Sequence, residues 1–183
     1  MTNRLLPLEE PFTNEIEEVL SRYPAVDGKI IALFRTFANS RRFLEKGVPN
    51  LLDDNSPLGL KDREIVILRV TANTNCEYEW GVHVAVFGKK AGFTEGQFAD
   101  ICQSSINRDL WSPEECLLLN VVDQLCFRGN IGQPDLEEFQ HRYTADTQLE
   151  IFALCGTYHT VSFVANAANL APEPFAARFP SRD

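Results

Sequence analysis

One stretch constrains the fold of this chain more than any other, residues 59–92, which read GLKDREIVILRVTANTNCEYEWGVHVAVFGKKAG. The pattern predicts two helices joined by a short Asn/Thr turn near Thr74 and Asn75. The first helix carries apolar residues on nearly all its sides, which is typical of a helix buried all round. We therefore expect this pair of helices at the centre of a helical fold.

The second of these helices carries most of the groups suited to chemistry. If it begins near Asn75, a repeat of 3.6 residues per turn puts Glu79 at the edge of one helical stripe. The residues expected on the stripe itself are Cys76, Trp80, His83 and Phe87. A thiol, a carboxylate and an imidazole are thus predicted to face the same way, whereas Tyr78 points about half a turn away.

Glu64 lies near the start of the first helix, among apolar residues. A buried carboxylate must be paired, hydrogen-bonded or protonated, because an isolated buried charge is too costly. If the two helices fold back across the Asn/Thr turn, Glu64 approaches the face that carries Cys76 and His83.

At these residues the chain resembles the carboxymuconolactone decarboxylase family, whose relatives include the alkylhydroperoxidases of the AhpD type. Glu64, Cys76 and His83 match the spacing of the peroxidase branch, but Glu79 stands where that branch has its second cysteine. The Glu79–His83 spacing is closer to the Glu-x-x-x-His of the decarboxylase branch. The resemblance extends over roughly residues 58–165 and implies an AhpD-like helical bundle.

The resemblance leaves three functions open. The first is a lyase or isomerase acting by acid–base chemistry on a small carboxylated lactone or related carbonyl compound, with no cofactor. The second is a thiol peroxidase, of peroxiredoxin-type activity, that uses Cys76 without a Cys-x-x-Cys partner. The third is a non-enzymatic protein that binds a small molecule. In each case the resemblance implies a homo-oligomer, a dimer, trimer or hexamer.

Each candidate residue also has a plainer interpretation. Cys76 is catalytic or a small apolar residue; a helix N-terminus and a nearby imidazolium would lower its pKa and make it the most reactive thiol. His83 is an acid–base group paired with Glu79, or a core histidine bonded to a carbonyl. Glu79 is catalytic or an ordinary surface charge. The other candidates are pocket-lining or packing residues: Trp80, Phe87 and His159.

Charge and cysteine usage exclude several classes. A net charge of −9 disfavours nucleic acids and anionic membranes as partners, since both require clustered Lys and Arg. Five cysteines without a Cys-x-x-Cys pair fit reduced thiols better than disulfides or a metal site. No segment has the apolar length of a signal peptide or membrane span, so we expect a cytoplasmic location.

The remaining chain shows helix signals and no convincing strand pattern, so the predicted fold class is all-α. We expect an N-terminal helical extension over residues 1–57 and the AhpD-like core over residues 58–183. Asp27 is predicted to cap a helix in the extension. In the core, Thr94 with Gln97 and Ser112 with Glu115 form predicted capping boxes. An almost uncharged helix is expected from about residue 146 to 170, in the core or at a subunit interface.

Overall fold

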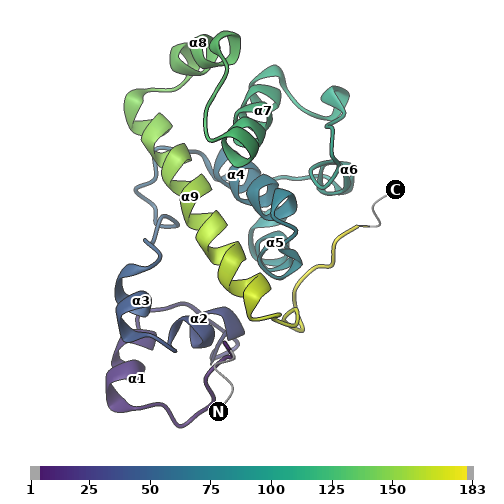
Figure 1. Ribbon diagram of the computed structural model, residues 1–183. Helices are drawn as coiled ribbons and strands as arrows, with labels where there is room; N and C mark the ends of the chain where they lie inside the picture. The colour runs from purple at the N-terminus through teal and green to yellow at the C-terminus, as the bar shows by residue number, and fades with distance from the viewer. Residues whose placement is uncertain (1–4, 181–183) are drawn as a thin grey trace.

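The computed structural model describes residues 5–180, and it confirms an all-α bundle (Figure 1). Near the N-terminus lie α1 (Asn14–Leu20), α2 (Ala32–Phe37) and α3 (Arg41–Lys46). The bundle consists of α4 (Leu60–Asn73), α5 (Glu77–His83), α6 (Glu95–Asp100), α7 (Pro113–Arg128), α8 (Gln133–Arg142) and α9 (Ala145–Ala167). Short π- and 3-10 turns occupy Val84–Gly88 (η1) and Arg108–Leu110 (η2).

Helix α4 is the centre of the bundle, as its sequence predicted. It packs against α5, α7 and α9, and the side chains of Ile65, Val66, Ile67 and Leu68 are completely buried. Four consecutive buried residues cover every direction around a helix, so α4 has protein on all sides. Any polar side chain on this helix must therefore find its partner inside the protein.

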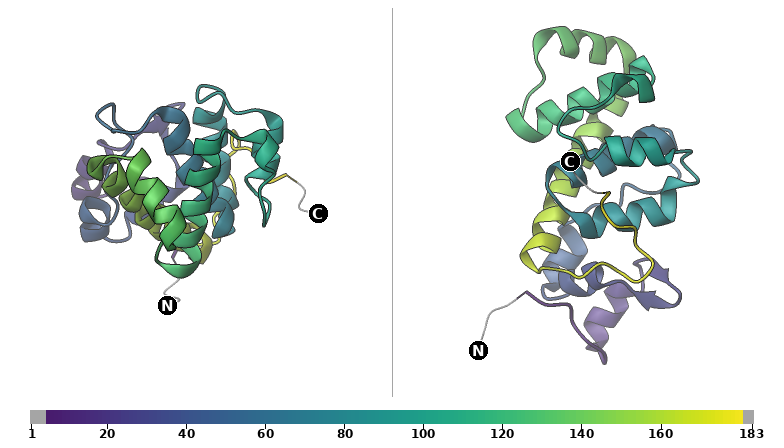
Figure 2. Two further views of the ribbon diagram at one scale, coloured as in Figure 1. Left: turned by 90° about the horizontal axis from the view of Figure 1, so that it is seen from above. Right: turned by 90° about the vertical axis from the view of Figure 1, so that its right-hand side faces the viewer.

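The N-terminal helices lie at one end of the long helix α9, and α8 lies at the other end (Figures 1 and 2). A two-stranded antiparallel hairpin, β1 (Ala25–Val26) and β2 (Lys29–Ile30), precedes α2. Asp27 and Gly28 form its turn with φ of 50° and 75°, so the prediction that Asp27 caps a helix is wrong. Two positive φ angles suit the tight turn of a hairpin, for which Asp-Gly is a preferred pair.

The link between α4 and α5 fixes how the two helices face each other. Asn75 takes a left-handed conformation with φ of 53°, which asparagine tolerates better than most residues. Cys76 is the N-cap of α5 and its N–H donates to the carbonyl of Thr71 at 2.8 Å. The helix therefore begins after Cys76 and not at Asn75, and its last turn widens into the π-helical segment η1.

The capping boxes predicted in the core are both present. Thr94 and Gln97 exchange side-chain and backbone hydrogen bonds at the start of α6, and Ser112 and Glu115 do the same at α7. Helix α9 runs close to the predicted length and is almost uncharged after its first turns. Within residues 5–180, no helix is both long and apolar enough to span a membrane.

The segment after α9 runs past α5 as an extended coil, drawn in yellow in Figure 1. The N–H of Ala177 donates to the carbonyl of Gly81 at 3.0 Å. A Cβ atom at Gly81 would lie 2.1 Å from the Ala177 carbonyl oxygen, so only glycine allows this approach. The tail thereby covers the side of α5 that faces away from α9.

Candidate active site

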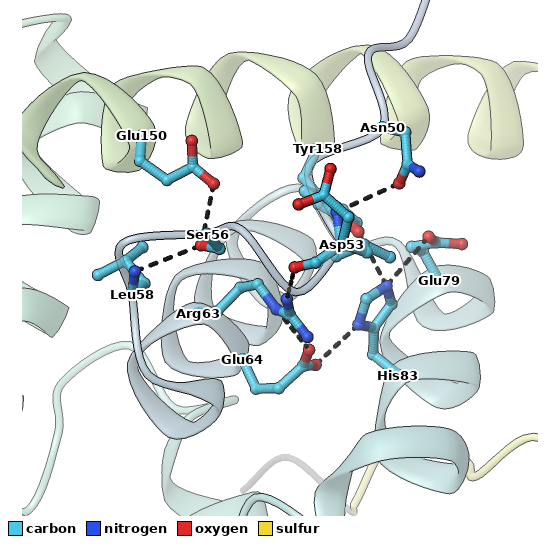
Figure 3. A network of polar contacts seen from close by, with 11 residues as sticks. Asn50, Asp53, Ser56, Leu58, Arg63, Glu64, Glu79, His83, Glu150 and Tyr158 are labelled. Atoms are coloured by element: carbon cyan, nitrogen blue, oxygen red, sulfur yellow. Dashed lines mark hydrogen bonds and ion pairs between the residues drawn. The ribbon is translucent and has the colours of Figure 1, made fainter. Parts of the chain in front are cut away.

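A buried polar network forms where α4, α5 and α9 meet, and Figure 3 shows its members. Glu64 comes from α4, Glu79 and His83 from successive turns of α5, and Tyr158 from α9. All four side chains are buried. The i, i+4 spacing puts Glu79 beside His83, so the geometry of helix α5 alone positions two of the four side chains relative to each other.

His83 is held between the other three groups. Its Nδ1 lies 2.7 Å from Oε2 of Glu64, and its Nε2 lies 3.0 Å from the Tyr158 hydroxyl oxygen. The same Nε2 is 3.4 Å from Oε1 of Glu79. The predicted approach of Glu64 to the His83 face is thus present, and both ring nitrogens have partners.

These contacts decide the charge of the ring. Burial acts to lower the pKa of His83, but the carboxylate of Glu64, and then that of Glu79, raise it to about 10 through charge and hydrogen bonds. His83 is therefore an imidazolium at neutral pH, and both of its nitrogens donate. Because Nε2–H then points to the Tyr158 oxygen, the proton of that hydroxyl is available to another acceptor.

Tyr158 is the site residue that the sequence analysis missed. It stands next to His159 in an uncharged stretch, where nothing in the sequence separates it from a packing residue. Burial, and then the charges of Glu79 and Glu64, raise its pKa well above the ordinary value. Tyr158 therefore keeps its proton and can serve as a hydrogen-bond donor.

A cavity of about 820 Å³ opens on one side of this network, lined by Glu79, Tyr158 and Phe87 from the bundle. The opposite wall is largely apolar and comes from the N-terminal helices and the loop that follows α3. Its apolar members include Leu33, Phe34, Phe37, Leu44, Leu51 and Leu52. Oε2 of Glu79 is buried without a hydrogen-bond partner among the described residues, so this carboxylate keeps an acceptor that no described protein group uses.

Two of the three residues expected in the pocket lie elsewhere. Phe87 lines the cavity, but Trp80 packs against Phe98 and Phe179 under the C-terminal tail. His159 is half-buried on α9, with Nδ1 2.8 Å from the carbonyl oxygen of Cys155 in its own helix. Helix α5 starts at Glu77, two residues after the predicted Asn75, and it contributes Glu79 to the cavity lining, not Trp80.

Cys76 is separate from the His83 network. Its side chain is fully buried, and burial raises its pKa to about 11, although hydrogen bonds with the Glu79 backbone and the Ser162 side chain oppose this. The expected lowering of the pKa by the helix N-terminus and His83 does not occur, because loss of water outweighs these favourable contacts. Cys76 is therefore a neutral thiol at physiological pH.

The two buried arginines of α4, Arg63 and Arg69, do not line the cavity. Arg69 is buried and binds both carboxylate oxygens of Asp123, at 2.6 and 2.7 Å. Arg63 lies with Nε 3.8 Å from Oε1 of Glu64 and donates to the carbonyl of Asp53 at 3.4 Å. In the described chain no cluster of three His, Cys, Asp or Glu side chains is arranged to hold a metal ion.

An all-α bundle with this buried Glu–His–Glu arrangement is an AhpD-like helical fold. The model of the carboxymuconolactone decarboxylase family matches residues 43–112, which confirms the resemblance over this segment. The matched segment contains Glu64, Cys76, Glu79 and His83 but not Tyr158.

Among solved structures, the chain is similar to an uncharacterized peroxidase-related protein from Silicibacter sp. TM1040. The two share 17% sequence identity with a TM-score of 0.74, over 98% of this chain and 100% of that one. At this identity the likeness establishes the fold alone. No curated protein matches the chain.

Proposed function

We propose that this protein is an enzyme that performs acid–base chemistry, as a lyase or isomerase, on a small carbonyl compound such as a lactone. The observation that carries the proposal is the position of Glu79 and Tyr158. Both touch the His83 ring and both line the same cavity, so one acceptor and one donor meet at a single ligand site.

Each group has a defined role in such a reaction. The Glu79 carboxylate accepts a proton from the carbon next to the substrate carbonyl, and the electron pair of that C–H bond moves toward the carbonyl oxygen. Tyr158 donates a hydrogen bond to this oxygen as it becomes negative. Glu79 then returns the proton to another carbon, which completes an isomerisation.

Loss of CO2 would use the same groups. The electron pair of the broken C–C bond moves into the adjacent carbonyl, where Tyr158 stabilises the charge. The carbon left behind needs a proton, which His83 holds as an imidazolium and can pass through Glu79. Glu64 stays hydrogen-bonded to Nδ1 and keeps the ring oriented, so neither reaction as written requires a cofactor.

The thiol-peroxidase alternative has less support. Peroxide reduction requires a thiolate within reach of the peroxide and a second thiol to regenerate it. Cys76 is a buried neutral thiol outside the cavity, and Glu79 stands at the position of the second cysteine.

The test is proton exchange, which does not depend on knowing the final product. A panel of lactones and ketones, with and without a carboxylate, is incubated with the full chain in D2O, and hydrogen loss is followed by NMR. Glu79→Gln is expected to lower the exchange rate about 10²–10⁴-fold. His83→Ala should abolish exchange, Tyr158→Phe should lower it about tenfold or more, and Cys76→Ala should retain most of it.

Matched controls lie on α8, where Glu138 and His141 are exposed and distant from the network. Glu138→Gln and His141→Ala should exchange at the wild-type rate. A parallel assay supplies an organic hydroperoxide with a dithiol reductant. Hydroperoxide turnover that disappears in Cys76→Ala and survives in Glu79→Gln would overturn the proposal, whereas inactivity in both assays would favour a binding protein.

A further inference from the structure

We infer that the cavity selects an uncharged, mostly apolar carbonyl compound that is larger than a simple lactone ring. The inference rests on the proposed function, in that it places the substrate carbonyl between Tyr158 and Glu79. It goes further by excluding substrates whose carboxylate would enter the buried part of the site, and it therefore favours the isomerase form of the proposed function over the loss of CO2.

The charges around the cavity support this selectivity. Glu79 contributes a buried carboxylate, and the positive charge of His83 is already shared between Glu64 and Glu79. Arg63, a buried cation beside this network, lies with Nε 3.8 Å from Oε1 of Glu64 and is not among the residues that line the cavity. A substrate carboxylate beside Glu79 would therefore meet a like charge, and among the described residues no buried cation lines the cavity to offset it.

Arg22 is the cation that lines the cavity among residues 5–180, and it does not offset the repulsion of a substrate carboxylate by Glu79. Arg22 is exposed at the mouth, and its guanidinium is 3.0 Å from Glu18. Glu45 also lines the mouth and adds a second negative charge, which Arg41 pairs at 3.0 Å. Since exposed charges interact weakly with a buried ligand, Arg22 cannot anchor a carboxylate at the depth of Tyr158.

The size and lining of the cavity define the rest of the ligand. A cavity of about 820 Å³ lies in the range used for ligands much larger than a five-membered ring. The wall opposite Glu79 and Tyr158 presents Leu33, Phe34 and Leu52, with no hydrogen-bonding side chain of their own. A ligand that fills this space therefore needs a carbonyl at one end and several apolar carbons beyond it.

Equilibrium binding tests the inference independently of catalysis. The probes are γ-undecalactone, its uncharged short homologue γ-butyrolactone, and undecanoate, which has the same chain length and a carboxylate. Calorimetry on the full chain should give γ-undecalactone an affinity at least tenfold above that of undecanoate and at least a hundredfold above that of γ-butyrolactone. Equal or tighter binding of undecanoate, or no binding of γ-undecalactone, would overturn the inference.

Two variants locate the selectivity. Glu79→Gln should raise the affinity for undecanoate about tenfold and change that for γ-undecalactone less than about threefold, because only the anion is repelled. Leu52→Asp should weaken γ-undecalactone at least tenfold, while Leu110→Asp, on the exposed η2 turn outside the cavity, should leave it unchanged. Unaltered selectivity in Glu79→Gln, or unaltered binding in Leu52→Asp, would contradict the assignment of this cavity.

The two proposals fail in different ways. If γ-undecalactone binds with the expected pattern and no carbonyl compound exchanges protons, the acid–base function is wrong and the selectivity stands. If a carboxylated lactone is turned over by Glu79 and undecanoate binds better than γ-undecalactone, the function stands and the selectivity is wrong.

Discussion

The charge of His83 makes the stability of the protein depend on pH in a predictable direction. The pKa of the ring rises from 6.5 in the unfolded chain to about 10 in the folded one. A raised folded-state pKa means that the stabilisation is fully present below pH 6.5 and is lost as the pH rises toward 10. Replacement of the ring by an uncharged side chain, His83→Gln, should remove this dependence.

The magnitude follows from the size of the shift. One pKa unit corresponds to about 1.4 kcal/mol, so the change from 6.5 to about 10 is worth about 5 kcal/mol. Wild-type protein should therefore lose about 2 kcal/mol of unfolding free energy between pH 6 and pH 8, and close to the full amount by pH 10. His83→Gln should be less stable than wild type at pH 6, with the gap narrowing at higher pH.

The assay is urea unfolding, followed by tryptophan fluorescence at intervals from pH 6 to pH 9. The difference between wild type and His83→Gln isolates the ring from other groups that titrate in this range. His141→Gln, at an exposed position on α8, is the matched control and should follow the wild-type curve. Parallel curves for wild type and His83→Gln, or a His83 ring that titrates by NMR at or below pH 6.5, would refute the reasoning.

Three other measurements probe the cavity, the thiols and the surface. Phe34→Ala removes an apolar residue of the cavity wall, so KM for an active substrate should rise about tenfold or more with little change in kcat. The control Phe127→Ala, at an exposed position, should change neither KM nor kcat. A fall in kcat without a rise in KM would contradict the assignment of Phe34 to the cavity wall. Limited alkylation followed by peptide mapping should label half-buried Cys126 before fully buried Cys76, and the reverse order would show that the Cys76 thiol is accessible. We still predict that the protein forms a homo-oligomer, and Phe163 is an exposed apolar residue on the nearly uncharged part of helix α9. Phe163→Glu should therefore dissociate the oligomer in a sedimentation experiment. A wild-type monomer at micromolar concentration would refute the prediction of an oligomer.

The features that the sequence predicted best are encoded locally. The capping boxes at Thr94 and Ser112 use hydrogen bonds within four residues, so their signal does not depend on the rest of the fold. The Glu79–His83 pair is one helical turn apart, which fixes its geometry once α5 exists. Glu64 could be added because a buried carboxylate needs a partner and the adjacent helix offered one.

The errors arise where tertiary structure or an unread turn decides the outcome. Tyr158 meets His83 across 75 residues of sequence, and no local pattern predicts such a contact. Trp80 was placed in the pocket because a uniform helix from Asn75 was assumed, whereas Cys76 lies outside the helix with ψ of 79°. The error at Asp27 has another origin, because Asp-Gly is a recognised hairpin-turn signal that is present in the sequence and was interpreted as a helix cap.

The groups of the proposed reaction and the apolar wall of the cavity come only partly from the same segment of the chain. Glu64, Glu79 and His83 all lie within residues 43–112, the segment that matches the family model. Leu33, Phe34 and Phe37, which form much of the apolar wall, lie before that segment, and Tyr158 lies after it. The matched segment thus holds the proposed acid–base groups of α4 and α5 and, through Leu44, Leu51 and Leu52, only part of the cavity wall. We therefore expect substitutions in α2 and in the loop after α3 to change which carbonyl compound fits while leaving the proposed reaction intact, whereas replacement of Tyr158 on α9 should impair the reaction itself.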